Sequence, residues 1–256
     1  LALAAEDGDI ANLIAGLVRQ QFRYIIIDPY ANAFNEEPNG ASWDKDDRSD
    51  FSSPWLWERK YEVDSLCYPI QLAWMLYANT GNADHFDAEF IAGVKKILDV
   101  FETEQHHERS PYFFIRDTDI PTESLSNNGK GSPVAYTGMT WSGFRPSDDA
   151  CTYHYLVPSN MFAAVVMGYL ERIFGGEILD DADIAARAGE LRRTITEGIE
   201  AHAKTTNRNG ETIYAFETDG LGHVNIMDDS NVPSLMAAPY LGYCAPDDPT
   251  YLATRR

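Results

Sequence analysis

The sequence has few cysteines and lacks the residue spacings that metal and nucleotide sites use. Its three cysteines, Cys67, Cys151 and Cys244, lie far apart and form no C-x-x-C pair, so a structural zinc site is not expected. His106 and His107 precede Glu108 without the spacing of an H-E-x-x-H motif, and no P-loop or G-x-S-x-G pattern occurs. The sequence therefore predicts no metal site and no cofactor.

Basic residues are scarce, and long hydrophobic runs are missing. The chain carries 20 basic against 40 acidic residues, a formal net charge of −20, which repels nucleic acid and anionic membranes. No run approaches the roughly 18 apolar residues that a membrane-spanning helix needs. We therefore expect a soluble protein, cytoplasmic or secretory, that binds neither nucleic acid nor membranes. A neutral ligand such as a sugar is compatible with this charge.

The hydrophobic residues that are present recur mostly at helical spacing. Apolar stripes with intervals of three and four residues predict four long helices, over residues 10–18, 90–101, 162–173 and 184–199. Pro158 stands just before the third stripe, where a first helical turn tolerates proline. Shorter helices are expected over Leu66–Ala78 and Val232–Tyr243. The pattern predicts an all-α protein.

Three long polar segments separate these helices: Asp28–Tyr61, Ser110–Tyr155 and Thr205–Ser230. Loops of such length in a compact domain are usually functional or disordered. These contain Trp43, Trp55, Trp57 and Trp141, whereas disordered linkers are poor in aromatic residues. We interpret them as ordered binding loops at one end of a set of helical hairpins that surround a central site.

The segment Gly138–Asp149 combines an aromatic residue, Trp141, a cation, Arg145, and two adjacent acids, Asp148 and Asp149. Two acids in one confined site cannot both ionise freely, so one of them can keep a proton near neutral pH and act as a general acid. The alternative is that an aspartate caps a following helix while Arg145 is its ion-pair partner.

Three further clusters have both a functional and a structural interpretation. Trp55–Asp64 offers aromatic faces and charged groups to a sugar, or is a charged helix entry. Asp28–Phe34 is similar in kind, or is a turn that ends a helix. Asp228–Asn231 contacts a sugar or, as its composition favours, caps the helix expected at Val232.

These segments resemble glycoside hydrolase family 125, the metal-independent exo-α-1,6-mannosidases. The resemblance covers nearly the whole chain, and the string Ser142 to Asp149 (SGFRPSDD) is its most specific part. The matching segments are Asp28–Asn35, Trp57–Asp64, Trp141–Asp149, Pro158–Phe162, Asp228–Leu235 and Pro239–Gly242.

The resemblance implies an (α/α)6 barrel of helical hairpins and an inverting hydrolysis of terminal α-1,6-linked mannose in α-mannoside oligosaccharides. It places the general acid in the Asp148–Asp149 pair, where we favour Asp149 as the proton donor and Asp148 as the residue that tunes it. In this interpretation the pocket is lined by Tyr30, Asn32, Trp57, Lys60, Glu62, Asp64, Trp141, Arg145, Asp229 and Asn231.

Two segments typical of the family have no counterpart in these 256 residues. One is a Trp-Leu-Arg-Asp-Ser stretch ahead of the first helix, and the other is a His-Glu-Ser segment whose glutamate is the general base. We therefore expect residues 1–256 to be a single catalytic-domain fragment, incomplete at both ends, with the base beyond Arg256. Such a fragment alone should be inactive.

Two other classes of function use the same features. Aromatic loops on a helical scaffold also occur in a carbohydrate-binding protein without catalysis. The same scaffold can carry a different sugar-active enzyme, such as an epimerase or a polysaccharide lyase, since a fold does not determine a function.

Overall fold

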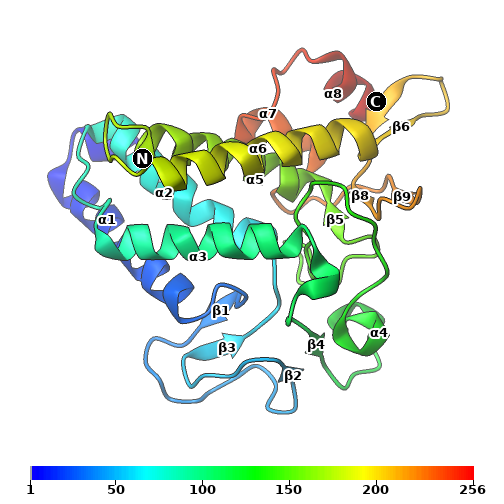
Figure 1. The fold of residues 1–256 in the computed structure, drawn as a ribbon, viewed down its shortest axis with the longest axis horizontal. Helices are drawn as coiled ribbons and strands as arrows, with labels where there is room; N and C mark the ends of the chain where they lie inside the picture. Colours follow the sequence, from blue (N-terminus) through cyan, green and yellow to red (C-terminus); the bar gives the residue numbers. More distant parts are fainter. Residues whose placement is uncertain (1) are drawn as a thin grey trace.

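The computed structural model describes residues 2–256, which form eight α-helices joined by 3₁₀ turns and very short strands (Figure 1). The five long helices are α1 (Gly8–Ile27), α2 (Val63–Thr80), α3 (Ala88–Glu104), α5 (Val157–Phe174) and α6 (Ala182–His202). The short ones are α4 (Ser126–Gly129), α7 (Ala238–Leu241) and α8 (Pro249–Thr254). The four predicted long helices and the Leu66–Ala78 helix are thereby confirmed.

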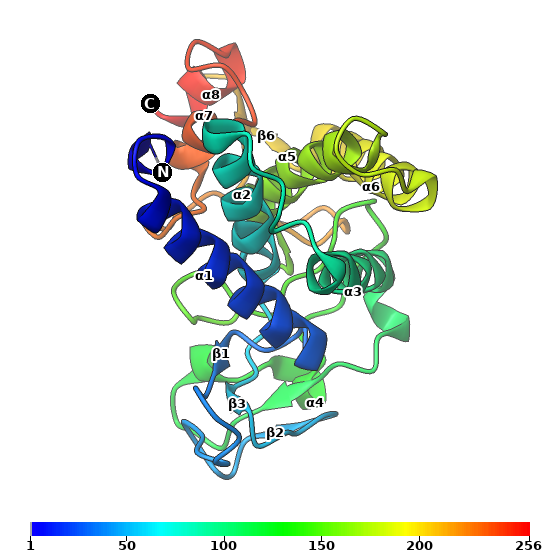
Figure 2. The same ribbon diagram turned by 90° about the vertical axis from the view of Figure 1, so that its left-hand side faces the viewer.

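The five long helices form a ring. Helix α1 packs against α2 and α3, α2 packs against α5, α5 packs along α6, and α6 returns to α3. Figure 2, turned by 90°, shows α1 and α2 on one side of this ring and α5 and α6 on the other. The chain is mostly helical, as the sequence predicts, with small sheets in addition.

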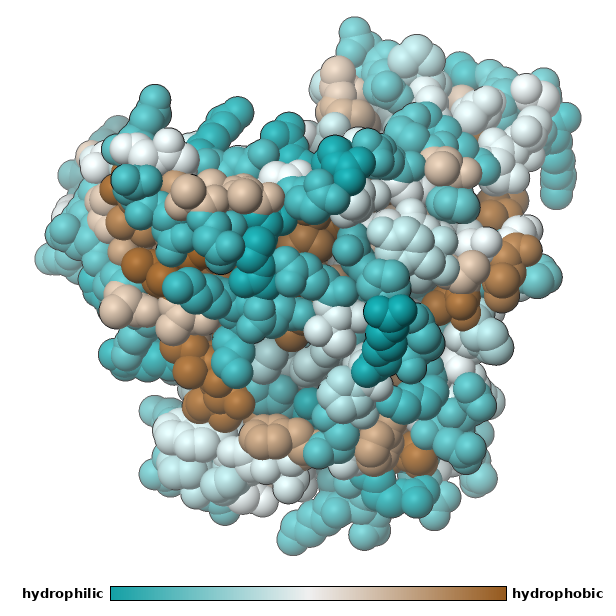
Figure 3. Space-filling model, in the orientation of Figure 1, coloured by the Kyte–Doolittle hydropathy of each residue, from teal (hydrophilic) through white to brown (hydrophobic). Residues whose placement is uncertain are grey.

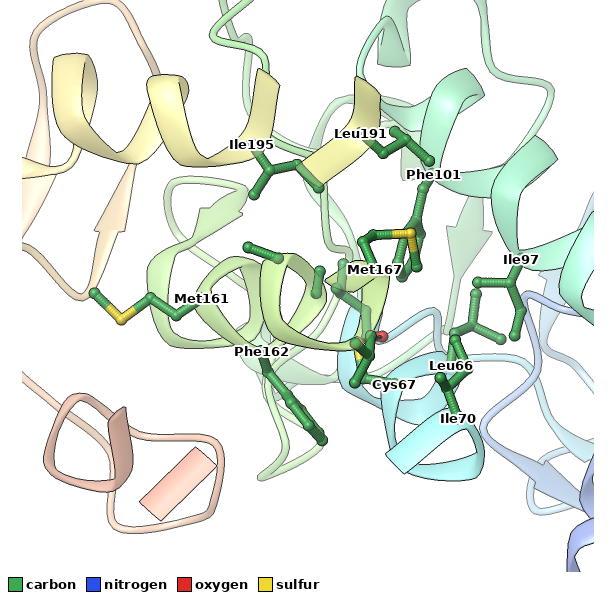
Figure 4. Packing of buried hydrophobic residues seen from close by; sticks show 14 of the residues in the cluster. Leu66, Cys67, Ile70, Ile97, Phe101, Met161, Phe162, Met167, Leu191 and Ile195 are labelled. Atoms are coloured by element: carbon green, nitrogen blue, oxygen red, sulfur yellow. Dashed lines mark hydrogen bonds between the residues drawn. The ribbon is translucent and has the colours of Figure 1, made fainter. Parts of the chain in front are cut away.

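Helix α5 is the most buried of the long helices and lies at the centre of the core (Figure 4). Its Met161, Phe162 and Met167 are inaccessible to solvent. The core also receives Leu66, Cys67 and Ile70 from α2, Ile97 and Phe101 from α3, and Leu191 and Ile195 from α6. The periodic stripes on α3 and α6 are therefore the faces that the ring buries.

Helix ends follow the sequence closely. Asp7, Asp87 and Asp181 cap α1, α3 and α6, each accepting at least one hydrogen bond from a backbone N–H of the first turn. Gly81 ends α2 with φ +70°, a left-handed conformation that favours glycine.

The long polar segments are ordered by short antiparallel strand pairs. Strand β1 (Ala33–Phe34) pairs with β3 (Leu56–Glu58), and β2 (Arg48–Ser49) pairs with β4 (Phe114–Ile115). The first two loops therefore meet below the helices in Figure 1. A three-stranded sheet consists of β5 (Tyr155–Leu156), β8 (Glu217–Thr218) and β9 (Val224–Asn225), and β6 (Lys204–Thr206) pairs with β7 (Thr212–Tyr214).

The predicted helix over Val232–Tyr243 is wrong. That segment contains only a 3₁₀ turn, η4 (Leu235–Ala237), and the single-turn α7. Pro239 lacks the N–H that a continuous helix would use at its position. The cap predicted for a helix at Val232 is therefore absent: the N-cap of η4 is Ser234, and the Asp228 carboxylate accepts the backbone N–H groups of Leu235 and Met236 within that turn.

The N-terminal half of α1 is less buried than its stripe suggests. Leu13 is 75% exposed and Leu17 is 45% exposed, whereas Val18 and Phe22 are buried. The face drawn in Figure 3 is mainly hydrophilic with separate hydrophobic patches. Within residues 2–256, no helix combines the length and the apolar character that crossing a bilayer requires.

Candidate active site

The two adjacent acids lie on a tight hairpin rather than at the start of a helix. Phe144 and Ala150 form a bridge, the N–H of Arg145 donates to the Asp149 carbonyl at 2.8 Å, and the N–H of Asp148 donates to the Arg145 carbonyl at 2.9 Å. Pro146 suits the first corner of such a turn. The next helix starts only at Val157, so a cap role for these acids is ruled out.

Asp148 occupies a backbone conformation that ordinarily favours glycine. Its φ is +65°, in the left-handed region where aspartate and asparagine are the best-tolerated alternatives to glycine. A glycine would relieve the backbone but would remove the carboxyl group. An outlier of this kind is common at functional sites, and it directs attention to what the carboxyl group contacts.

The Asp148 carboxyl group lies near Asn32, which precedes β1, and near Glu58, the last residue of β3. Asn32 donates from Nδ2 to Oδ1 of Asp148 at 3.3 Å and to Oε2 of Glu58 at 3.0 Å. The Nζ of Lys60 donates to the Asp148 carbonyl oxygen at 2.9 Å. Partial burial, and then the negative charge of Glu58, raise the pKa of the Asp148 carboxyl group above its ordinary value.

Two further carboxyl groups are buried next to this hairpin. Glu62 accepts from Ser65 Oγ at 2.7 Å, and Asp64 accepts from Ser159 Oγ at 3.2 Å. Burial, followed by the charge of Asp64, raises the pKa of Glu62 well above its ordinary value, and burial raises the pKa of Asp64 to about 7. Asp148 adds to both effects, so the three carboxyl groups form one electrostatic unit.

A buried cationic group supports this unit. Lys60 is almost inaccessible, and its Nζ lies 2.8 Å from Oε2 of Glu123. Arg116 binds Asp47, Glu58 and Glu123, with its Nη2 at 2.8 Å from Oε1 of Glu58. Because these cations are held by several acids at once, they fix the orientation of Glu58.

Arg145 is held by a residue that sequence reasoning did not identify. Its Nε donates to Oε1 of Glu217 at 2.7 Å, so its ion-pair partner is not one of the adjacent aspartates. No segment that resembles the family contains Arg116, Glu123 or Glu217. Only Glu58 falls inside one, the Trp55–Asp64 cluster.

The predicted aromatic residues lie in different environments. Trp141 is fully buried between His107 and His154, with ring centroids 3.6 and 4.6 Å away, so it exposes no face to a ligand here. Tyr30 donates its hydroxyl to Oε1 of Glu104 at 2.8 Å. Trp57 is 38% exposed and meets the edge of Trp43.

Asn231 lies against the tip of the hairpin, and Asp229 is bonded to Asn231. Asp229 accepts the N–H of Asn231 at 3.0 Å, and the Asn231 side chain donates to the Pro146 carbonyl at 3.5 Å. The structure therefore brings the predicted residues Asn32, Lys60, Asp148 and Asn231 to one hairpin.

A cavity of about 610 Å³ lies between α1 and α2, and none of these acids belongs to its lining. Asn32 and Ser65, which bond Asp148 and Glu62, belong to its lining, together with apolar and aromatic residues such as Tyr24, Leu66 and Tyr68. An apolar wall with a few polar groups is typical of small-molecule sites. Among residues 2–256, no three His, Cys, Asp or Glu side chains are arranged to hold a metal ion.

Comparisons with known proteins agree with one another. A family model described as metal-independent α-mannosidase (GH125) matches residues 1–256. The chain is 35% identical over 272 residues to the Meiotically up-regulated gene 157 protein of Schizosaccharomyces pombe, covering all of this chain and 53% of that protein.

A solved Streptococcus pneumoniae structure is similar throughout the chain. It comes from a study of metal-independent α-mannosidases in the processing of N-linked glycans and is a non-productive complex with α-1,6-mannobiose. The sequence identity is 54%, the TM-score is 0.97, and the match covers 100% of this chain and 60% of that one. The chain thus spans a little over half the length of each of these two relatives.

Proposed function

The chain belongs to the metal-independent α-mannosidase family, glycoside hydrolase family 125, and we propose that it carries the acid half of an inverting exo-α-1,6-mannosidase. The linkage is supported by the pneumococcal relative, which binds α-1,6-mannobiose. The ring of helices is, in this proposal, part of an (α/α)6 barrel with the loop hairpins at its active-site end.

One observation carries the proposal: the acidic hairpin, with Asp148 at positive φ, adjoins the buried carboxyl groups of Glu62 and Asp64. An inverting glycosidase needs a carboxylic acid that protonates the leaving oxygen as the bond to the anomeric carbon breaks. The raised pKa of Asp148 keeps more of this group protonated near neutral pH. We therefore favour Asp148 as the proton donor, the reverse of the division expected from the sequence, and assign Asp149 the neighbouring role.

The buried acids suit hydroxyl binding. Burial and the charge of Asp64 raise the pKa of Glu62 well above its ordinary value, which favours the protonated form, a hydrogen-bond donor to a sugar hydroxyl. Asp64 is only 4% exposed and is bonded to Ser159, which leaves little room for a water molecule to activate. Asn32, Lys60, Arg145, Asp229 and Asn231 complete the proposed pocket, with Tyr30 and Trp141 supporting its loops from behind and Trp57 at its rim.

The general base is proposed to lie outside these 256 residues. Inversion requires a second carboxylate roughly 6.5–9.5 Å from the acid, on the opposite side of the anomeric carbon, to take a proton from the attacking water. Neither Glu62 nor Asp64 meets that need. We propose that the part of the family domain that this chain does not span supplies the base, so residues 1–256 alone should not turn over substrate.

Product analysis separates this function from its rivals. The complete gene product, incubated with α-1,6-mannobiose, should release free mannose. A carbohydrate-binding protein would bind the disaccharide and leave it intact. An epimerase would return an isomerised sugar and a lyase an unsaturated one, and either product would overturn the proposal.

A further inference from the structure

Glu217 lies at the start of β8, is inaccessible to solvent, and directs its carboxylate at both ends of the acid hairpin. At the first end its Oε1 accepts a hydrogen bond from the Nε–H of Arg145 at 2.7 Å. At the second end it accepts the backbone N–H groups of Thr152 and Tyr153, each at 3.3 Å. Nδ2 of Asn225 donates a further bond at 3.3 Å.

The strand pairing fixes where this carboxylate sits. Glu217 pairs with Leu156 of β5 on one side and with Asn225 of β9 on the other. Residue 156 comes only a few positions after the hairpin, so the sheet and the hairpin share one short stretch of backbone. The position of Glu217 relative to the hairpin is therefore set by backbone pairing and not only by its side chain.

Arg145 transmits this position to the two acids. Its backbone N–H and carbonyl bond Asp149 and Asp148 respectively, while its side chain bonds Glu217 and lies over the ring of Phe216, 5.4 Å from the centroid. A displacement of Arg145 must therefore displace both acids.

We propose that Glu217 is the positioning residue for the proton donor: by holding Arg145 and the N–H groups of Thr152 and Tyr153, it fixes the hairpin that carries Asp148 and Asp149. The inference rests on the proposed function. A buried ion pair seldom adds stability over apolar side chains of the same size, whereas this pair defines a geometry, and proton transfer depends on geometry to within about 1 Å.

The test uses two substrates that differ in their need for protonation. α-1,6-Mannobiose has a poor leaving group, and 2,4-dinitrophenyl α-mannoside has a good one that departs with little assistance. In Glu217→Gln of the complete gene product, kcat/KM on mannobiose should fall about 10²-fold, while the loss on the aryl mannoside stays several-fold at most. Equal losses on the two substrates would mean a merely structural role and would overturn the proposal.

Two further variants make the result specific. Glu211→Gln is the matched control, because Glu211 lies on the separate β6–β7 hairpin, where it pairs with the C-terminal Arg256. This variant should retain the activity on both substrates. Arg145→Lys keeps the charge but loses the Nε–H donor, so it should reproduce the selective loss, also if Glu217→Gln fails to fold. Arg145→Lys with equal losses on both substrates would contradict the proposal.

Hydrogen exchange separates this inference from the proposed function. Glu217→Gln should raise amide exchange in residues 143–153, and Glu211→Gln should not. Unchanged exchange in that segment would overturn the positioning role whatever the enzyme hydrolyses. Conversely, a wild-type protein that hydrolyses neither mannoside, with faster exchange in Glu217→Gln, would overturn the mannosidase assignment and keep Glu217 as the residue that fixes the hairpin.

Discussion

Asn32 donates a hydrogen bond from its side-chain amide to Oδ1 of Asp148 at 3.3 Å, although the two residues are 116 positions apart in the sequence. The same amide also bonds Glu58, and the Asn32 Oδ1 accepts the N–H of Lys60. Asn32 is thus the residue that ties the loop after α1 to the acid hairpin.

Replacing Asn32 by aspartate should impair and shift catalysis at once. The aspartate has no N–H to donate, and loss of the hydrogen bond to Glu58, which is paired with Arg116, costs about 1.5–3 kcal/mol, or roughly 10- to 150-fold in kcat/KM. A new negative charge beside Asp148 should raise the pKa of Asp148 further and move the basic limb of the pH–kcat/KM profile to higher pH. Asn39→Asp, an exposed change of the same charge, should do neither. An unshifted basic limb would contradict the contact of Asn32 with the proton donor.

Asp148→Asn should cost about 10²–10⁴-fold in kcat on α-1,6-mannobiose, because proton transfer to the leaving oxygen is lost. Asparagine tolerates the left-handed backbone at this position, so the hairpin should persist. The loss on 2,4-dinitrophenyl α-mannoside should be much smaller. Asp149→Asn, measured in parallel, decides the assignment: if it shows the larger and leaving-group-dependent loss, Asp149 is the donor, as the sequence suggested.

The raised pKa of Asp64 predicts a pH-dependent stability. The folded protein holds this proton up to about pH 7, whereas the unfolded chain releases it near the ordinary value of 3.8. The folded state therefore binds more protons between these values, and stability falls as pH rises from about 4 to 7. The contribution is at most on the order of 4 kcal/mol.

Urea unfolding at pH 4, 5.5 and 8 measures this effect. Asp64→Asn cannot ionise, so its stability should decline less than that of the wild type over this range. Asp119→Asn, at an exposed position, should follow the wild type. Parallel curves for Asp64→Asn and the wild type would show that Asp64 titrates normally.

Chelators should leave the activity of the complete gene product unchanged. The family is described as metal-independent. Proton transfer and hydroxyl binding give each acidic residue of the site a proposed role without a metal ion. The measurement is the rate on α-1,6-mannobiose after dialysis against EDTA, with and without added Ca²⁺ or Zn²⁺. Loss of activity that a metal ion restores would contradict this mechanism.

The helices were predictable because the apolar residues of α3, such as Phe90, Val94 and Phe101, recur at a spacing that only a helix turns into one face. The failure over Val232–Tyr243 has an equally local cause, since hydrophobicity alone does not show that Pro239 interrupts the backbone hydrogen bonds of a helix. The spacing of apolar residues therefore predicts helices, and the positions of prolines must be considered with it to predict where a helix is interrupted.

The site was predictable only where its residues cluster in the sequence. Asp148 and Asp149 stand out as neighbours, and Lys60, Glu62 and Asp64 share one segment. Arg116 and Glu217 could not be found, because what gives them a role is pairing between distant strands: β2 with β4, and β5 with β8. Trp141 was predicted to line the pocket because it stands close to Asp148 and Asp149 in the sequence. In the structure it is instead buried between two histidine rings.

The most direct test of the account is the anomeric configuration of the first mannose released from α-1,6-mannobiose, followed by proton NMR before mutarotation. The complete gene product should yield β-mannose first, because water attacks from the face opposite to the acid hairpin. Residues 1–256 alone, assayed beside it, should release none. First-formed α-mannose would mean a retaining mechanism, and robust turnover by residues 1–256 would place the base within this chain; either result would contradict the account.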